Sequence, residues 1–310
     1  MKVLVTCPPM LAAIDEFRAD FTSRNIELLT PAVVQTLSID ELKALVPEAD
    51  GWIIGDDPAC REVLEAGVQG RLRAAVKWGV GIDNVDTAAA NELGLTVINT
   101  PGVFGREVAD LAVSYVSALA RDTFTIDREV RTGGWPKPRG ASLAGKTVAL
   151  VGYGDIGSNT ARRLRAAEMN VIVYDPYIAL DGPGDGLSQE DWPEGLGEAD
   201  FIVFTCALTP ANRHILDDGA LACCKRGVRI VNVARGLLID EAALARALDT
   251  SHVQAAALDV FEVEPLPMIS PLRRFERCIF GSHNASNTEE AVHRTNEQAI
   301  ATLFESLGVT

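Results

Sequence analysis

The chain has 310 residues, of which 47% are hydrophobic and 23% charged, so it is long enough for two ordinary domains with buried cores. Its formal net charge of -15, from 43 acidic and 28 basic residues, repels phosphate backbones and anionic lipids. We therefore expect no nucleic-acid partner and no membrane partner. No stretch reaches the roughly 18 apolar residues of a membrane span, and the first residues lack a signal-peptide pattern.

The cysteines bear on the cellular compartment. None of their spacings matches a zinc ribbon or a CxxC motif, so we expect free thiols, a cytoplasmic location and no metal site. The adjacent Cys223 and Cys224 leave two interpretations open, a redox pair or two small residues on a helix.

Short apolar runs alternate with helical patterns through the first third of the chain, which is typical of βα units and parallel sheets. We expect strands at residues 2–6, 26–30, 51–55, 74–78 and 96–99. Helices are expected at residues 10–22, 38–46, 59–66 and 86–93. The pattern predicts an α/β fold with a doubly wound parallel sheet.

A second α/β region follows a long helix expected at residues 104–121, where apolar residues recur at helical spacing. Strands are expected at residues 147–151, 171–174, 201–205, 229–233, 255–258 and 278–280. Six parallel strands with crossover helices have the size of a complete dinucleotide-binding fold. The Gly/Pro-rich segment 179–197 is expected to be irregular, and the residues beyond about 285 to form a final amphipathic helix.

A glycine motif, "GYGDIG", lies between the first strand of this region and its helix. Gly152 permits the tight turn, Gly154 lets the backbone approach a pyrophosphate, and Gly157 lets the helix lie against the sheet. The backbone N–H groups of Asp155 and Ile156 would then bind the phosphates at the helix N-terminus. A glycine-rich turn without a ligand is the alternative.

Asp175 supports the nucleotide interpretation, because it ends the next strand, where a carboxylate can accept hydrogen bonds from the adenosine ribose hydroxyls. The same charge would repel the 2′-phosphate of NADP. The expected cofactor is therefore NAD.

Polar residues also follow three later strands. Arg235 follows one strand, Asp259 and Glu264 the next, and His283 the last, so all should lie at the edge of the sheet where ligands bind. A histidine backed by a carboxylate can donate a proton to a keto oxygen during hydride transfer. An arginine can bind a carboxylate and polarise the neighbouring carbonyl, and the pattern indicates 2-keto acid reduction and its reverse. Taken singly, each residue could be structural.

These features resemble the D-2-hydroxyacid dehydrogenase family, which includes D-3-phosphoglycerate, D-lactate, glyoxylate and hydroxypyruvate enzymes. The resemblance rests on "KWGVGIDNVD", "NTPGVFGREVADLAVSYVSALAR", "VGYGDIG", "VNVARGLLIDEAALARAL" and "ALDVFEVEPL". It implies a flavodoxin-like catalytic, substrate-binding domain made of residues 1–98 and 286–310. A Rossmann NAD-binding domain, residues 99–285, would be inserted between them.

The resemblance also implies residue roles. Arg235 would bind the substrate, Glu264 and His283 would form the acid–base pair, and Asp259 would bind the nicotinamide carboxamide. Further substrate contacts would come from Lys77, Val80 and Gly81. The cofactor site would also be lined by Val80, Cys206, Val233, Ala234 and Ser286. Since relatives dimerise through the region of the long apolar helix, a homodimer is expected.

The sequence leaves more than one activity and substrate open. Asp56 and Asp57 stand where phosphoglycerate dehydrogenases often carry an arginine, and they would repel a phosphate. A formate- or phosphite-type oxidoreductase could use the same fold, although the formate type pairs its histidine with glutamine instead of a residue like Glu264. An NADH-sensing binding protein of corepressor type is the other alternative, and the sequence does not name the 2-hydroxy acid.

Overall fold

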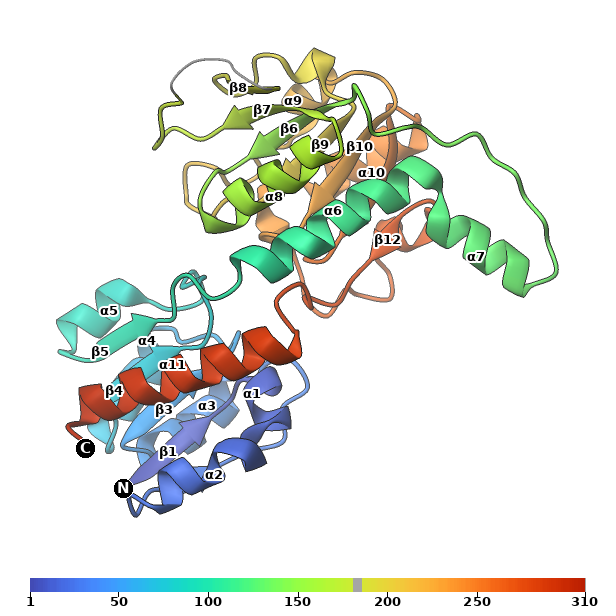
Figure 1. Ribbon diagram of the computed structural model, residues 1–310. Coiled ribbons are helices and arrows are strands. Elements are labelled where there is room, and N and C mark those ends of the chain that lie inside the picture. The colour runs from blue at the N-terminus through green and yellow to red at the C-terminus, as the bar shows by residue number, and fades with distance from the viewer. Residues whose placement is uncertain (181–185, 310) are drawn as a thin grey trace. The chain divides into compact units, whose positions relative to one another are not determined.

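The computed structural model describes residues 1–180 and 186–309, which divide into two compact units (Figure 1). Unit 1 consists of Met1–Phe104 and the residues from Asn287 onward, and unit 2 consists of Gly105–Ser286. Each unit is built on one parallel sheet covered by helices, so the predicted fold class is confirmed. That unit 1 is the substrate-binding domain stays a prediction.

The sheet of unit 1 has the strand order β2-β1-β3-β4-β5, which is the order of flavodoxin-like folds. Its strands are β1 (Lys2–Val5), β2 (Glu27–Leu29), β3 (Gly51–Ile54), β4 (Ala74–Lys77) and β5 (Thr96–Asn99). All of the pairings are parallel, so the carboxyl ends of the strands share one edge.

Helices cover both faces of this sheet. They are α1 (Pro8–Ala12), α2 (Ile14–Thr22), α3 (Ile39–Leu45), α4 (Arg61–Gln69), α5 (Thr87–Glu92) and α11 (Glu289–Leu307). The single helix expected at residues 10–22 was wrong, because Ala13 leaves the helical conformation at φ -105° and ψ 10° and separates α1 from α2. Helix α11 runs along β3 and β4 (Figure 1).

The core of unit 1 follows the alternation of its strands. Trp52 and Ile54 pack with α3, α4 and α5, and Ile53 points to the opposite face. On that opposite face, Phe21 of α2 and Phe304 of α11 meet edge to face with their ring centroids 5.2 Å apart. The C-terminal helix is thus part of the core formed by the N-terminal residues.

The sheet of unit 2 has the order β12-β11-β10-β9-β6-β7-β8 among the described residues. Its strands are β6 (Thr147–Val151), β7 (Asn170–Tyr174), β8 (Leu187–Gln189), β9 (Phe201–Phe204), β10 (Val228–Asn232), β11 (Val253–Leu258) and β12 (Ile279–Phe280). The order reverses between β6 and β9, the position at which doubly wound sheets bind nucleotides.

Strand β8 corrects the expectation of an irregular segment at residues 179–197. It pairs in parallel with β7 at the edge of the sheet, and all of its residues are half-exposed, so it lacks the apolar pattern of a strand. Residues 181–185 of that segment lie outside the described residues.

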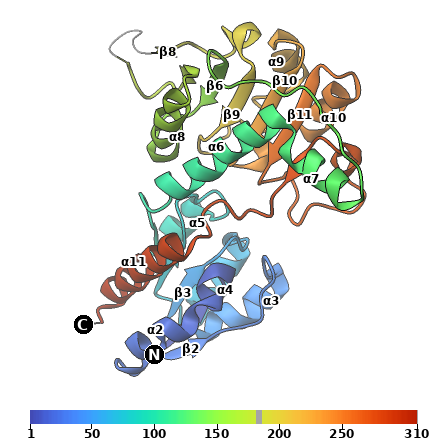
Figure 2. The same ribbon diagram turned by 45° about the vertical axis from the view of Figure 1, so that its right-hand side comes forward.

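The helices of unit 2 are α6 (Gly105–Arg121), α7 (Thr123–Arg131), α8 (Asp155–Ala166), α9 (Asp218–Cys223) and α10 (Glu241–Asp249). Helix α6 lies beside α8 and against β10 and β11, so much of its apolar surface belongs to the core of unit 2 (Figures 1 and 2). Helix α7 was not expected, and its residues are all half or fully exposed. In the described ranges, no helix has both the length and the apolar character needed to cross a membrane.

Candidate active site

The glycine motif forms the turn between β6 and α8. Gly152 has φ 96°, and a Cβ there would lie 2.7 Å from the Cys206 backbone. A Cβ on Gly157 would lie 2.1 Å from the Gly152 carbonyl oxygen, so the helix needs glycine to approach the turn. Gly154 differs, because within the described ranges a Cβ there would meet no atom closer than 4 Å. Packing thus requires Gly152 and Gly157, whereas Gly154 borders open space.

That open space lies at the N-terminus of α8, whose first residues are Asp155 and Ile156. The first N–H groups of a helix have no partner within the helix, and they attract anions together with the helix dipole. The carboxylate of Asp155 packs against the start of α6, where a Cβ on Gly105 would lie 2.0 Å from its Oδ1. The turn therefore fits a pyrophosphate, with backbone N–H groups as the donors.

Asp175 is connected directly to this turn. Its Oδ2 accepts the Tyr153 N–H at 2.7 Å, and its Oδ1 accepts the Tyr177 N–H at 2.9 Å. An ionised carboxylate has about four acceptor positions, so these bonds leave capacity for ribose hydroxyls. The structure thus brings Asp175 and the glycine turn together.

Cys206 closes the other side of the turn. Its backbone abuts Gly152, and its Sγ accepts the Asn212 Nδ2 at 3.8 Å. Burial raises the pKa of the Cys206 thiol to about 11, so the side chain is neutral at pH 7. It can line a cofactor site but carries no charge there.

Asp259, just after β11, is 1% exposed. Its Oδ2 accepts the Ala285 N–H at 2.8 Å, and its backbone carbonyl accepts the His283 N–H at 2.7 Å. Its Oδ1 finds no hydrogen-bond partner in the part of the chain that the structure describes. Burial raises the pKa of this carboxyl. A buried acceptor without a partner is rare, and the amide group of nicotinamide would satisfy it, so the site fits the cofactor.

Arg235 lies in the loop after β10 and directly follows the buried Val233 and Ala234 in the sequence. Asn232, the last residue of β10, holds this loop: its Oδ1 accepts the Ala234 N–H at 3.0 Å and its Nδ2 donates to the Arg235 carbonyl at 2.9 Å. Sequence reasoning missed Asn232. The sequence signal that could have identified it is an asparagine at the end of an apolar strand. At such a position, a side chain that forms hydrogen bonds with nearby backbone groups stabilises the turn.

Gly236 was also missed, and it brings two loops of the site into contact. A Cβ there would lie 1.8 Å from the carbonyl carbon of Phe261, in the loop after β11. The N–H of Phe261 in turn donates to Glu264 Oε1 at 2.9 Å. The loop of Arg235 therefore packs against the loop that orients Glu264, and only glycine allows this approach.

Glu264 and His283 form the pair expected from the sequence. Glu264 Oε2 lies 2.8 Å from His283 Nδ1, and both side chains are half-buried. His283 has φ 55°, an unusual conformation for a non-glycine residue, and such conformations cluster at functional sites. The contact of Nδ1 with a carboxylate fixes the orientation of the ring. Ser286, the last residue of unit 2, is half-exposed.

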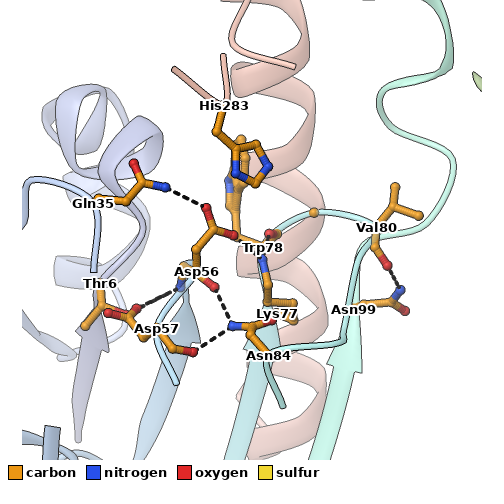
Figure 3. A network of polar contacts seen from close by, with 12 residues as sticks. Thr6, Gln35, Asp56, Asp57, Lys77, Trp78, Val80, Asn84, Asn99 and His283 are labelled. Carbon is orange, nitrogen blue, oxygen red and sulfur yellow. Dashed lines mark hydrogen bonds and ion pairs between the residues drawn. The ribbon is translucent and has the colours of Figure 1, made fainter. Parts of the chain in front are cut away.

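The candidate residues of unit 1 lie at the carboxyl edge of its sheet (Figure 3). Lys77 ends β4 with a buried side chain, and its Nζ donates to the Trp78 carbonyl at 2.7 Å. The loop that follows is held in place, because Asn99 Nδ2 donates to the Val80 carbonyl at 2.7 Å (Figure 3). Val80 is 40% exposed and Gly81 half-exposed.

Comparison with known proteins shows the family to which this chain belongs. Residues 113–285 match the family model "D-isomer specific 2-hydroxyacid dehydrogenase, NAD binding domain". The hydroxypyruvate reductase of Thermotoga maritima is 36% identical over 282 residues, which are 88% of this chain and 90% of that protein. The D-3-phosphoglycerate dehydrogenase 2, chloroplastic, of Arabidopsis thaliana is 39% identical over 259 residues. That match covers 82% of this chain but 41% of the plant protein, so this chain spans less than half of that relative's length.

Solved structures agree over nearly the whole chain. The NAD-dependent formate dehydrogenase of Staphylococcus aureus, in complex with NAD, superposes with a TM-score of 0.88 at 27% identity, covering 99% of this chain and 96% of that one. A glyoxylate reductase from Paecilomyes thermophila gives a TM-score of 0.83 at 27% identity, covering 99% and 95%. The chain therefore belongs to the D-isomer specific 2-hydroxyacid dehydrogenase family, and its unit 2 contains the family's NAD-binding domain.

Proposed function

We propose that the protein is an NAD-dependent oxidoreductase that interconverts a D-2-hydroxy acid and the corresponding 2-keto acid. The observation that carries the proposal is the contact of 2.8 Å between Glu264 and His283 within the NAD-binding domain. This pair lies after β11 and β12, at the edge where α/β sheets bind ligands. A proton donor at that edge is what carbonyl reduction by a nicotinamide requires.

In the reduction, bound NADH supplies the hydride that the keto carbon receives. His283 gives the proton to the keto oxygen through Nε2, while Glu264 accepts a hydrogen bond from Nδ1 and stabilises the positively charged ring. In the oxidation, the neutral ring accepts the hydroxyl proton at the same nitrogen. Glu264 also keeps the ring in one orientation, because its other oxygen is held by the Phe261 N–H.

Arg235 would bind the carboxylate of the substrate with paired hydrogen bonds and polarise the adjacent carbonyl. Its half-exposed side chain and the loop held by Asn232 support this role. Lys77 and the backbone of Val80 and Gly81 are proposed as further substrate contacts, and Val80 also as a cofactor contact.

The NAD site would use the turn at Gly152, Gly154 and Gly157 with the N–H groups of Asp155 and Ile156 for the pyrophosphate. Asp175 would bind the adenosine ribose, and Asp259 the nicotinamide carboxamide. The lining would come from Cys206, Val233, Ala234 and Ser286. Since a carboxylate at residue 175 repels a 2′-phosphate, we expect NADH to be the better cofactor and Asp175→Ala to erode that preference, measured as kcat/KM with NADH and NADPH. Equal efficiency with NADPH in the unchanged protein would contradict the assignment.

A homodimer and a cytoplasmic location complete the proposal. The free state of all six cysteines fits a reducing compartment. Three apolar side chains on and after α7 are exposed: Phe124 by 44%, Val130 by 42% and Trp135 by 78%. They favour association between copies more than α6 does, because much of the apolar surface of α6 belongs to the core of unit 2. Light scattering at micromolar concentration should give twice the mass of 33.2 kDa, and the monomer mass would refute the dimer.

The direct test measures NADH oxidation with glyoxylate, hydroxypyruvate, 3-phosphohydroxypyruvate and bulkier 2-keto acids, and NAD reduction with the D and L forms of the matching hydroxy acids. We expect turnover of at least one keto acid and a preference for the D form. NADH binding without any turnover would favour an NADH-sensing protein, and NAD reduction by formate or phosphite alone would favour an oxidoreductase of that type.

A further inference from the structure

Two glutamates of unit 2 join the loop that carries Glu264 to the start of α10. Glu241 is the first residue of α10, and Glu262 lies in the loop after β11, two residues before Glu264. Glu262 Oε1 accepts the Glu241 N–H at 2.9 Å, and Glu241 Oε1 accepts the Glu262 N–H at 2.8 Å. Each carboxylate thus binds the backbone of the other residue, and we call these two residues the glutamate pair.

His214, between β9 and α9, meets the glutamate pair from a third loop. Its Nε2 lies 3.3 Å from Glu262 Oε1, which is an ion-pair distance without the alignment of a hydrogen bond. Its backbone has φ 53°, and its N–H donates to the Leu237 carbonyl at 2.8 Å, in the loop of Arg235. Loops that follow three neighbouring strands, β9, β10 and β11, are therefore connected around Glu262.

Hydrogen bonds and one close backbone contact hold the loop from Phe261 to Glu264. A Cβ on Gly236 would lie 1.8 Å from the Phe261 carbonyl carbon and 2.4 Å from the Glu262 nitrogen, so the backbone passes close to Gly236. The glutamate pair then fixes Glu262 at both its N–H and its side chain. Val263 is 59% exposed, so apolar packing of its side chain does little to fix the position of Glu264.

The charges of the three glutamates oppose this arrangement. Burial raises the pKa of the Glu241 carboxyl, the hydrogen bond from the Glu262 N–H lowers it, and the charges of Glu262 and Glu264 raise it again. The carboxylates repel one another, so charge alone would drive them apart. The bonds to backbone N–H groups, together with the N-terminus of α10 beside Glu262, are what favour the observed positions.

We propose that Glu241 and Glu262 are positioning residues, which hold the loop after β11 so that Glu264 stays in contact with His283. The inference rests on the proposed function, because the contact of 2.8 Å between Glu264 and His283 is what it serves. Residues that support a catalytic group through hydrogen bonds act by keeping its geometry, and they need not touch the substrate. The acceptor oxygen of each glutamate is the feature that the proposal requires, and not its charge.

The test measures the contact itself by proton NMR of the full chain. The proton on His283 Nδ1 that faces Glu264 should resonate far downfield of the amide protons, and His283→Ala assigns the signal by its loss. Glu262→Ala removes the acceptor of the Glu241 N–H, so the signal should broaden or disappear. Glu262→Gln keeps an acceptor oxygen and should restore the signal. Glu198→Ala, at an exposed position between β8 and β9, is the matched control and should leave it unchanged.

Steady-state rates give a second measurement, with saturating NADH and a 2-keto acid that the unchanged protein reduces. Glu262→Ala should lower kcat about 10–100-fold, because a small misplacement of catalytic groups is costly even when its origin is distant from the substrate. The KM for the keto acid and the affinity for NADH, measured by its fluorescence, should change little. Glu241→Ala, which removes the other bond of the glutamate pair, should have the same effects.

The positioning role is overturned if Glu262→Ala and Glu241→Ala keep both the downfield signal and kcat. It is also overturned if Glu262→Gln loses both as fully as Glu262→Ala does, since the acceptor oxygen would then not be what matters. Turnover of no 2-keto acid by the unchanged protein overturns the proposed function instead. The NMR signal tests the glutamate pair without any turnover, so the two failures are distinguishable.

Discussion

The two sheets end in edges of the same kind but with opposite hydrogen-bonding states. In unit 2, Asp259 keeps an acceptor without a partner among the described residues, and Gly154 borders open space. In unit 1, both oxygens of Asp57 and the ammonium group of Lys77 are bonded to the protein itself. A buried polar group without a hydrogen-bond partner is costly, so a ligand that supplies such a partner would be favoured at the edge of unit 2. At the edge of unit 1, Asp57 and Lys77 already have their partners within the protein.

The largest expected effect comes from removing the proposed proton donor of unit 2. His283→Ala should lower turnover by about 10²–10⁴-fold, because it removes the group proposed to protonate the keto oxygen. NADH should still bind, as checked by its fluorescence. His293→Ala, on the surface of α11, is the control and should retain turnover. Near-normal turnover of His283→Ala would remove the acid–base assignment.

The next comparison separates a glycine needed for packing from one that borders open space. Gly157→Ala forces a Cβ against the Gly152 carbonyl and should destabilise the protein by about 1–3 kcal/mol. Gly154→Ala should leave the melting temperature within a degree or two of the unchanged protein, yet weaken NADH binding by filling the space beside α8. Calorimetry and NADH titration measure the two effects, and equal loss of stability in both variants would contradict the assignment of the open space.

Two aspartates compare the edges directly. Asp57→Asn places an amide donor against a backbone N–H group, so it should cost about 1–3 kcal/mol of stability. Asp259→Asn can keep the bond to the Ala285 N–H and removes a buried charge, so the protein without NADH should lose little or no stability. Its affinity for NADH should fall. Thermal unfolding with and without NADH measures both variants.

The pH dependence of Asp259 sharpens this contrast. Burial raises the pKa of this carboxyl above the ordinary value of 3.8. The unchanged protein should therefore lose stability as the pH rises from that value through the raised pKa, and Asp259→Asn should lack this loss. A stability difference between the two proteins that is independent of pH would contradict the cost of the buried charge.

The smallest expected effect concerns Glu264. Glu264→Gln keeps the shape but removes the charge that favours the protonated ring of His283. Keto-acid reduction needs that form, so the fall of its rate with rising pH should move to lower pH than in the unchanged protein. Oxidation of the hydroxy acid needs the neutral ring and should show the opposite trend. A pH profile of kcat/KM that stays in place would remove Glu264 from the pair.

Much of the fold could be predicted from the sequence because long segments carry a clear period. The apolar strands from residue 147 onward and the "GYGDIG" turn specified a nucleotide-binding sheet, and the polar residues after its strands specified the Glu264–His283 contact. Strand β8 was not predicted because its half-exposed position at the edge of the sheet imposes no apolar alternation. Helix α7 was not predicted because it has no buried face to set an apolar pattern.

The residues missed at the site act through shape and not through chemistry. Gly236 is required by a backbone that approaches from a loop 25 residues later, at Phe261, and no local pattern reports such a distant neighbour. The side chain of Asn232 holds its loop through two hydrogen bonds to backbone atoms, and a single asparagine in the sequence does not predict such bonds. In the same way, the sequence showed Asp56 and Asp57 as a pair of equal charges, and only the tertiary contacts separate the exposed carboxylate from the buried one.

The packing of α11 has a consequence for the order of folding during synthesis. Unit 1 needs Phe304 and its neighbours to complete the face of its sheet that holds Phe21, but unit 2 lies between these segments in the chain. At ribosomal rates of about 5–20 residues per second, the N-terminal strands wait roughly ten to forty seconds for their last helix. Unit 2 is continuous and can complete its core first. During that interval the uncovered face of unit 1 is the surface of the nascent chain that a chaperone would have to protect.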